Sequence, residues 1–287
     1  MKLLYADAHC HSNPVKGMGA EEIAKRFRRY NGWFIALVSL PPYHYGFEET
    51  GVESYVKTIE LMINEADKMK RQGIETIVFI GFHPAEVDEY VKRGLSLKEI
   101  IDLAEKVFNI ITQYIRKGLV HGIGEVGRQH YSTSPERIVT SEIILMKALE
   151  AAKDYDAPVH LHLEQGGWVT VESINKIIDK INIRKDRIFL HHSNYDVGFW
   201  SEKYGFWYTI PAKERDLKKT LVEKRKLVLV ESDFIDDPRR PGVSSYPWDI
   251  ALRINKLLEH GVLDRDYIYE VMVDHVVEAY GLEYPRV

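Results

Sequence analysis

Histidine and carboxylate side chains follow short apolar runs at several places in this chain of 287 residues. The first is the segment Asp7-Ala8-His9-Cys10-His11, which comes directly after the apolar residues 3–6. Residues two apart on a β-strand point to the same side, so His9 and His11 are predicted to share one face at the end of a strand. Paired histidines are also common on protein surfaces, and they indicate a site only when other ligand-type residues join them.

Five more residues of these types end later apolar runs, namely His83, Glu125, His162, His191 and Asp233. Imidazole nitrogens and carboxylate oxygens together bind divalent ions such as Zn, Mn, Co or Ni, and one carboxylate can bridge two ions. Two such ions acidify a water molecule, which then attacks an ester-like centre. The set therefore predicts metal-dependent hydrolysis. A Ser-His-Asp mechanism is disfavoured because the chain has no G-x-S-x-G motif.

The apolar runs alternate with amphipathic segments along the whole chain. The predicted strands lie at residues 3–7, 33–40, 76–80, 119–123, 158–164, 187–190, 206–210 and 227–230. The predicted helices lie at residues 19–30, 53–71, 97–116, 135–155, 170–181 and 213–224, with a less clear segment at 195–204 and two helices after residue 248. This alternation predicts an α/β protein, a (β/α)8 TIM barrel that forms a single domain over residues 1–287. A doubly wound open sheet is the alternative, but no G-x-G-x-x-G follows the first strand and no P-loop is present.

A barrel of this kind carries its chemistry where the strands end. The candidate residues follow predicted strands one, three, four, five, six and eight, so they are expected to converge on one face. His160 and His162 lie on the same side of one strand, and His162 is preferred as the ligand because it is nearer the strand end. Of the adjacent His191 and His192, only one can point inward.

Composition restricts the other classes of protein. The net charge of −4 does not describe a general polyanion-binding surface, although a local cleft could still bind nucleic acid. Cys10 is the only cysteine, which excludes an internal disulfide and suits a reducing cytoplasm. No apolar stretch is long enough for a signal peptide or a membrane span. We therefore expect a cytoplasmic protein without membrane association.

The motifs, in this order, resemble those of the TatD-type metal-dependent hydrolases of the amidohydrolase superfamily. They are D-x-H-x-H at 7–11, G-F-H-P at 81–84, I-G-E-x-G at 123–127, P-V-x-x-H at 158–162, L-H at 190–191 and E-S-D at 231–233. Each motif alone is weak, whereas six in order are specific. The resemblance covers nearly the whole chain.

The resemblance implies two divalent ions, of Zn, Mn, Mg, Co or Ni. It implies one ion bound by His9, His11, Glu125 and Asp233, and a second bound by Glu125, His162 and His191. Asp233 would also take a proton from the attacking water, so Asp233 and Glu125 are the predicted catalytic residues. His83 is expected to face the substrate, and His192 is expected to meet the substrate or a loop.

Three departures from the family pattern concern the substrate. Glu164 stands where the family commonly has arginine, Arg128-Gln129 stand where it commonly has L-D, and residues 234–246 replace its D-A-P-Y continuation. Arg128 is the predicted substitute for the missing charge. Arg239 and Arg240 are a candidate phosphate clamp, although a solvated loop pair is the commoner outcome. The substrate is expected to be a small-molecule or nucleic-acid ester, with phosphodiesters including DNA as the first choice. The alternatives are a lactone, amide or phosphotriester, or a metal-binding scaffold without activity.

Overall fold

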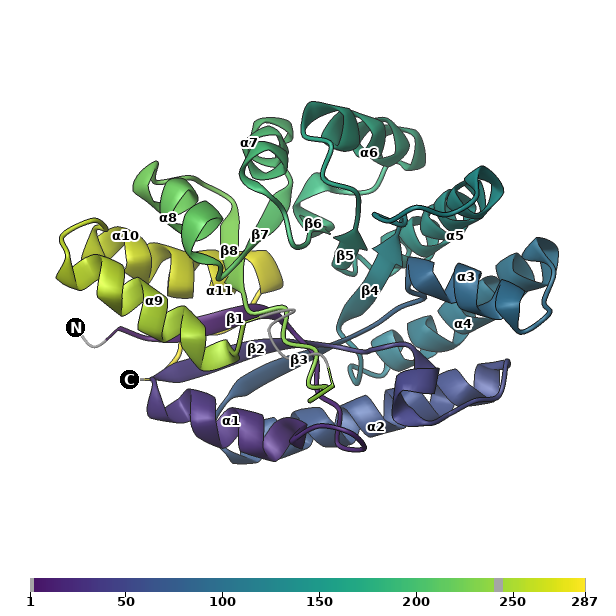
Figure 1. Cartoon of the computed structure of the whole chain (residues 1–287), viewed down its shortest axis with the longest axis horizontal. Helices are drawn as coiled ribbons and strands as arrows, with labels where there is room; N and C mark the ends of the chain where they lie inside the picture. Colours follow the sequence, from purple (N-terminus) through teal and green to yellow (C-terminus); the bar gives the residue numbers. More distant parts are fainter. Residues whose placement is uncertain (1–2, 240–244, 287) are drawn as a thin grey trace.

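The computed structural model describes residues 3–239 and 245–286. Eight parallel strands pair in sequence order into one sheet, and helices surround it (Figure 1). The strands are β1 (Tyr5–Cys10), β2 (Gly32–Val38), β3 (Glu75–Ile80), β4 (Gly122–Gly127), β5 (Val159–His162), β6 (Ile188–Leu190), β7 (Trp207–Pro211) and β8 (Val228–Glu231). The predicted single-domain (β/α)8 barrel is confirmed.

The first and last strands meet and close the sheet. Cys10 and Phe234 form a parallel bridge, and the amide of Asp233 donates to the carbonyl of His9 at 3.0 Å. The buried carboxylate of Asp7 accepts hydrogen bonds from the backbone amide (2.8 Å) and the hydroxyl (2.5 Å) of Ser232. Asp7 therefore fixes the segment directly after β8, which contains Asp233, against the strand that carries His9.

Helices cover the outside of the barrel. They are α1 (Gly19–Arg29), α2 (Val52–Arg71), α3 (Pro84–Lys92), α4 (Leu97–Arg116), α5 (Pro135–Lys153), α6 (Trp168–Ile181), α7 (Tyr195–Tyr204), α8 (Glu214–Val222), α9 (Pro247–Glu259), α10 (Arg265–Tyr269) and α11 (His275–Tyr280), with a π-helical segment at Glu270–Asp274. No helix in the described part of the chain combines the length and apolar character that a membrane span needs.

Two apolar layers hold these elements together. Ile35, Leu37 and Val78 belong to the outer layer between strands and helices, and alternate residues such as Phe34 and Phe79 belong to an interior cluster. Residues of the last helical region also enter the interior cluster, namely Val273, Val276, Ala279 and the partly buried Tyr280. The C-terminal helices therefore close the end of the barrel that lies opposite the strand ends.

Helix α3 was not predicted from the sequence, because His83-Pro84 was interpreted only as the end of a strand. In the structure His83 caps this helix: its Nδ1 accepts from the amide of Ala85 at 3.0 Å, while Glu86 accepts from the amide of His83 at 2.7 Å. Proline at the first helical position suits this start, since its missing N–H would have no partner there.

The predicted fourth strand, 119–123, was placed too early, because the glycines after it were interpreted as a loop. Glu125 thus lies within β4 and not beyond its end. Two of these glycines allow close contacts between strands. A Cβ added at Gly124 would lie 2.8 Å from the Cβ of His160, and a Cβ added at Gly127 would lie 1.9 Å from the carbonyl oxygen of His162.

Candidate metal centre

One buried carboxylate, that of Glu125, lies among five imidazole rings at the carboxyl end of the barrel. The exposed fraction of its side chain is 5%. The nearest nitrogens to its oxygens are His191 Nε2 at 2.7 Å, His162 Nδ1 at 2.9 Å, His11 Nε2 at 3.8 Å, and His9 Nε2 and His83 Nε2, each at 3.9 Å. The predicted convergence of strand ends is therefore present in the structure.

His9 and His11 both face this cluster, as their spacing predicted. The interior cluster already contains Ala8, so strict alternation would turn His9 outward. The pairing of β1 with β2 shifts register between Asp7 and Cys10, and the rings of His9 and His11 lie with centroids 5.0 Å apart. Cys10 is fully buried in the outer layer, turned away from the cluster.

The hydrogen-bond partner of Nδ1 determines what Nε2 of His11 and His191 can bind. His11 Nδ1 lies 2.9 Å from the carbonyl of Val38, and His191 Nδ1 lies 3.2 Å from the carboxylate of Glu231. Both partners only accept, so each Nδ1 carries hydrogen and each neutral ring presents a lone pair at Nε2. Such an arrangement is typical of metal-ligating histidines.

Buried nitrogens that lack a hydrogen-bond partner indicate whether divalent ions fit these residues. Within the described residues, the buried Nε2 atoms of His9 and His162 have no hydrogen-bond partner. Buried polar atoms usually have one, and an ion among these nitrogens and the Glu125 carboxylate would supply it. The donor set of imidazoles and carboxylates therefore fits borderline divalent ions.

The charges of the cluster depend strongly on one another. Burial opposes charge on Glu125, yet His191 and His83 outweigh burial and hold the pKa of Glu125 well below its usual value. Burial likewise opposes an imidazolium at His191, yet Glu231 and Glu125 outweigh it and raise the pKa of His191 well above its usual value. Glu125 and His191 therefore each shift the pKa of the other in the direction that favours its charge.

Asp233 lies beside His11, with Oδ1 3.8 Å from His11 Nε2. Its backbone has a φ of +52°, a left-handed conformation that Asp tolerates better than most residues. The exposed fraction of its side chain is 28%, so the carboxylate can reach both the cluster and solvent.

The two ambiguous histidine pairs lie in distinct places. His162 contacts Glu125, whereas His160 lies deeper, with its ring centroid 4.3 Å from that of Phe79. His191 contacts Glu125, whereas His192 has a backbone φ of +43° and its ring lies 4.6 Å from that of His162, measured between centroids.

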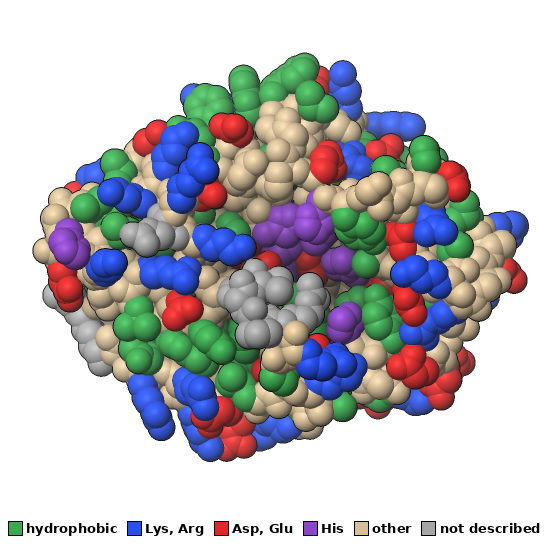
Figure 2. All heavy atoms as spheres, viewed as in Figure 1, with side chains coloured by type: hydrophobic (Ala, Val, Ile, Leu, Met, Phe, Trp, Pro, Cys, Tyr) green, Lys and Arg blue, Asp and Glu red, His purple; other side chains and the backbone are tan. Residues whose placement is uncertain are grey.

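A cavity of about 310 Å³ opens above Glu125, and Figure 2 shows histidine side chains gathered at the centre of this face. Its described lining contains no lysine or arginine; it consists of His11, Leu40, Pro41, Tyr43, His44, His83, Ala85, Glu125, His130, Tyr131, His162, His191, His192, Asp233 and Ile235.

Arg128 does not join this lining, and its predicted substrate-binding role is not supported by the geometry. The guanidinium bonds to the carboxylates of Glu164 (2.7 and 3.0 Å) and Glu142 (2.9 Å). Its charge is therefore already compensated within the protein. Arg239 likewise bonds to Asp237 at 2.7 Å, and Arg240 lies outside the described residues.

Replacing Arg128 by methionine is expected to leave kcat/KM for a phosphodiester unchanged. Stability should fall by about 1–2 kcal/mol, because Glu164 and Glu142 lose their partner but both reach solvent. Urea unfolding and steady-state kinetics would measure both effects. A large rise in KM would restore the substrate-binding role.

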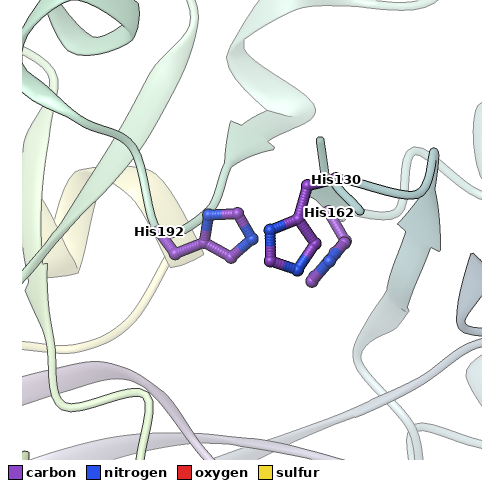
Figure 3. A group of neighbouring side chains, drawn as sticks. All are labelled: His130, His162 and His192. Carbon is purple, nitrogen blue, oxygen red and sulfur yellow. The ribbon is translucent and has the colours of Figure 1, made fainter. Parts of the chain in front are cut away.

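His130 was not assigned to the site from the sequence. It lies five residues after Glu125 in the loop that follows β4, and its ring stands 4.7 Å from that of His162 and 5.3 Å from that of His192, measured between centroids (Figure 3). The only signal for it was this place in a loop at the carboxyl end of a strand.

The loop that carries His130 is tied to α3 by Asp88. The Asp88 carboxylate accepts hydrogen bonds from four side chains, those of Gln129, Tyr131, Thr133 and Arg137. Burial opposes the charge of Asp88, but the bonds from Thr133 and Arg137 outweigh it and lower the pKa of Asp88 below its usual value.

Replacing Asp88 by asparagine is expected to reduce stability by about 2 kcal/mol at pH 7, since hydrogen bonds to a charged group are lost. A lowered pKa in the folded state contributes stability above the ordinary value of 3.8, and this contribution disappears as pH falls through the folded value. The difference in urea unfolding between the variant and wild type should therefore shrink in acid. Asp102→Asn, on an exposed helix face, is the matched control. If the difference in stability between Asp88→Asn and wild type stayed constant down to acid pH, the stabilising role of the ionised Asp88 would be contradicted.

The closed barrel, with histidines and carboxylates gathered where its strands end, defines the class of this protein. It is a (β/α)8 barrel with a candidate metal centre at the carboxyl ends of its strands.

Within this class the chain belongs to the TatD family: the family model described as TatD related DNase matches residues 6–281. An uncharacterized protein of Methanocaldococcus jannaschii is 27% identical over 281 residues, which span 96% of this chain and 95% of that protein.

Solved structures show the same fold. A TatD homologue from Escherichia coli has a TM-score of 0.66 at 16% identity, covering 97% of this chain and 98% of that chain. An organophosphorus hydrolase from Deinococcus radiodurans has a TM-score of 0.64 at 11% identity, covering 98% and 93%. At these identities the likeness concerns the fold alone.

Proposed function

We propose that the protein is a hydrolase that uses two divalent ions to cleave phosphodiester bonds in nucleic acids or smaller phosphodiesters. The observation that carries this proposal is the single carboxylate of Glu125 among five imidazoles, because one shared carboxylate can serve two ions. His9, His11, Glu125 and Asp233 would hold one ion, and Glu125, His162 and His191 the other. The bound ions supply Lewis-acid stabilisation of negative charge and lower the pKa of water.

The protein's own residues supply the remaining chemistry. Asp233, half-buried at the cavity, acts as the general base that takes a proton from the attacking water. Glu231 accepts from His191 Nδ1 and so keeps the lone pair of that ring directed at the cluster. Burial of the cluster excludes bulk water from the charges that develop.

His83 and His192 would hold the oxygens of the substrate. His83 Nδ1 accepts from the amide of Ala85, and His192 Nδ1 accepts from the side-chain amide of Gln165 at 3.1 Å. A neutral ring whose Nδ1 accepts must carry its hydrogen at Nε2, so both residues can donate from Nε2. Two donors of this kind bind phosphoryl oxygens in a cavity whose described lining has no cationic side chain.

An uncharged ester is the second candidate substrate, because the same lack of lysine and arginine in the described lining disfavours a strongly anionic ligand. A lactone or a phosphotriester would suit this cavity. The organophosphorus hydrolase of Deinococcus radiodurans shares the fold, which is compatible with this alternative.

A substrate panel should separate the candidates. Single-stranded DNA, a dinucleotide, a lactone and a phosphotriester would each be incubated with chelator-treated protein, and then with Mn, Zn or Mg added back. We expect phosphodiester cleavage that disappears with chelator and returns with metal. Turnover of the lactone or triester without cleavage of DNA or dinucleotide would select the second candidate. No bound metal under any of these ions would refute both candidates, and bound metal without turnover of any substrate would select the metal-binding scaffold. The cytoplasmic location remains a proposal, testable by cell fractionation.

A further inference from the structure

A chain of hydrogen bonds runs from the C-terminal helix to His9. The hydroxyl of Tyr280, the last residue of α11, lies 3.2 Å from the carbonyl oxygen of Ala8 and 3.1 Å from His160 Nε2. The other nitrogen of the same ring, His160 Nδ1, lies 3.0 Å from His9 Nδ1. His9 and His160 are both fully buried, so solvent cannot replace these bonds.

The direction of each bond follows from the partner that can only accept. The Ala8 carbonyl accepts, so the Tyr280 hydroxyl donates to it and can accept from His160 Nε2–H. A neutral His160 with hydrogen at Nε2 has a lone pair at Nδ1. His9 must then donate from Nδ1, which leaves the lone pair of His9 at Nε2, 3.9 Å from the Glu125 carboxylate.

The alternative direction would either place a second proton on His160 or turn the Tyr280 hydroxyl toward His160 and away from the Ala8 carbonyl, which would then lose this hydrogen bond. The His160 ring is fully buried, with its centroid 4.3 Å from Phe79 and 5.0 Å from Phe189, and an unpaired charge in apolar surroundings is costly. The neutral ring and the direction that it imposes are therefore favoured.

We infer that His160 and Tyr280 are positioning residues that hold His9 in the tautomer that can bind a divalent ion. The inference rests on the proposed function in naming His9 as a ligand. It gives the C-terminal helix a role in the metal centre, because α11 reaches the site through the interior of the barrel. Partners that hold the second nitrogen of a ligating histidine typically change metal affinity about 10–100-fold.

The first test observes the tautomer directly. Long-range ¹H–¹⁵N correlation spectra of metal-free protein with ¹⁵N-labelled histidine would distinguish hydrogen at Nδ1 from hydrogen at Nε2 in His9. Loss of its signals in a His9→Gln variant would assign them. We expect hydrogen at Nδ1 of His9; hydrogen at Nε2 overturns the inference.

The second test measures Zn affinity by competition with a chelator. His160→Leu is expected to weaken the binding of one Zn ion about 10–100-fold, and Tyr280→Phe, which keeps the ring packed on Phe189, less strongly. His160→Gln should recover part of the loss because its side-chain oxygen can accept from His9. The controls are His121→Leu, remote from the cluster, and Tyr267→Phe, whose hydroxyl also donates to a carbonyl.

The outcomes separate this inference from the proposed function. Unchanged Zn affinity in both His160→Leu and Tyr280→Phe would overturn the positioning role even if the enzyme cleaves phosphodiesters. Weakened Zn binding without cleavage of any phosphodiester would support the positioning role and reject the proposed substrate. If His160→Leu does not fold, Tyr280→Phe and the tautomer of His9 decide the question.

Discussion

Replacing Glu125 by glutamine is expected to abolish hydrolysis and to lower the metal content from two ions per chain to one or none. Glu125 is the only carboxylate within 4 Å of five imidazoles in the described structure, and an amide neither bridges two ions well nor balances their charge. Lewis-acid stabilisation is worth several kcal/mol, so kcat should fall by about 10³-fold or more. Metal analysis after gel filtration and steady-state kinetics would measure the two effects.

Glu164→Gln is the matched control for this variant. Glu164 follows the neighbouring strand β5 but bonds to Arg128 and lies outside the cavity lining. Its replacement should leave metal content and kcat near those of wild type. If Glu125→Gln retained two ions and full turnover, the shared-carboxylate centre would be wrong.

Strand periodicity explains why much of the centre could be predicted from the sequence. In a barrel, the place of a residue along its strand decides whether it reaches the open face, so His162 could be distinguished from His160 by position alone. The position of His191 follows from the same rule, whereas His9 and His11 share a face as their spacing predicted but lie inward only with the register shift between Asp7 and Cys10. The fold, and the convergence of these side chains on one face of the barrel, depend on local patterns that can be recognised in the sequence.

Features that depend on partners distant in the sequence could not be predicted. The charge of Arg128 is compensated by residues 14 and 36 positions later, which only the folded chain brings together at its guanidinium. The place of His130 depends on the bonds of its loop to Asp88, on another helix. The partner of His9 is His160, and that ring is oriented from the opposite end of the barrel by Tyr280.

Histidines of one cluster can perform different tasks because each ring has a second nitrogen with a partner of its own. At His11 and His191 an acceptor holds Nδ1, so Nε2 is free to bind an ion. At His83 and His192 a donor holds Nδ1, so Nε2 can donate to a substrate. Residue type and spacing do not distinguish these cases, whereas the hydrogen-bond partners do.

Replacing Asp233 by asparagine is expected to lower kcat by about 10²–10⁴-fold, the usual contribution of a general base, while at least one ion stays bound. Asparagine tolerates the left-handed backbone at this position, where φ is +52°, so the loss would not reflect a distorted loop. His9, His11 and Glu125 remain to hold the ion. Metal content together with kcat would separate loss of the base from loss of metal.

Asp236→Asn provides the comparison, because Asp236 has nearly the same φ of +55° three residues further along the same loop but does not line the cavity. Its carboxylate accepts from the backbone amides of Asn13, Met18 and Gly19, so this variant should lose stability and keep its kcat. Normal turnover by Asp233→Asn would remove Asp233 from the mechanism. Proton transfer would then have to reach solvent through the remaining groups at the cavity mouth, where His130 is the most exposed histidine that lines it.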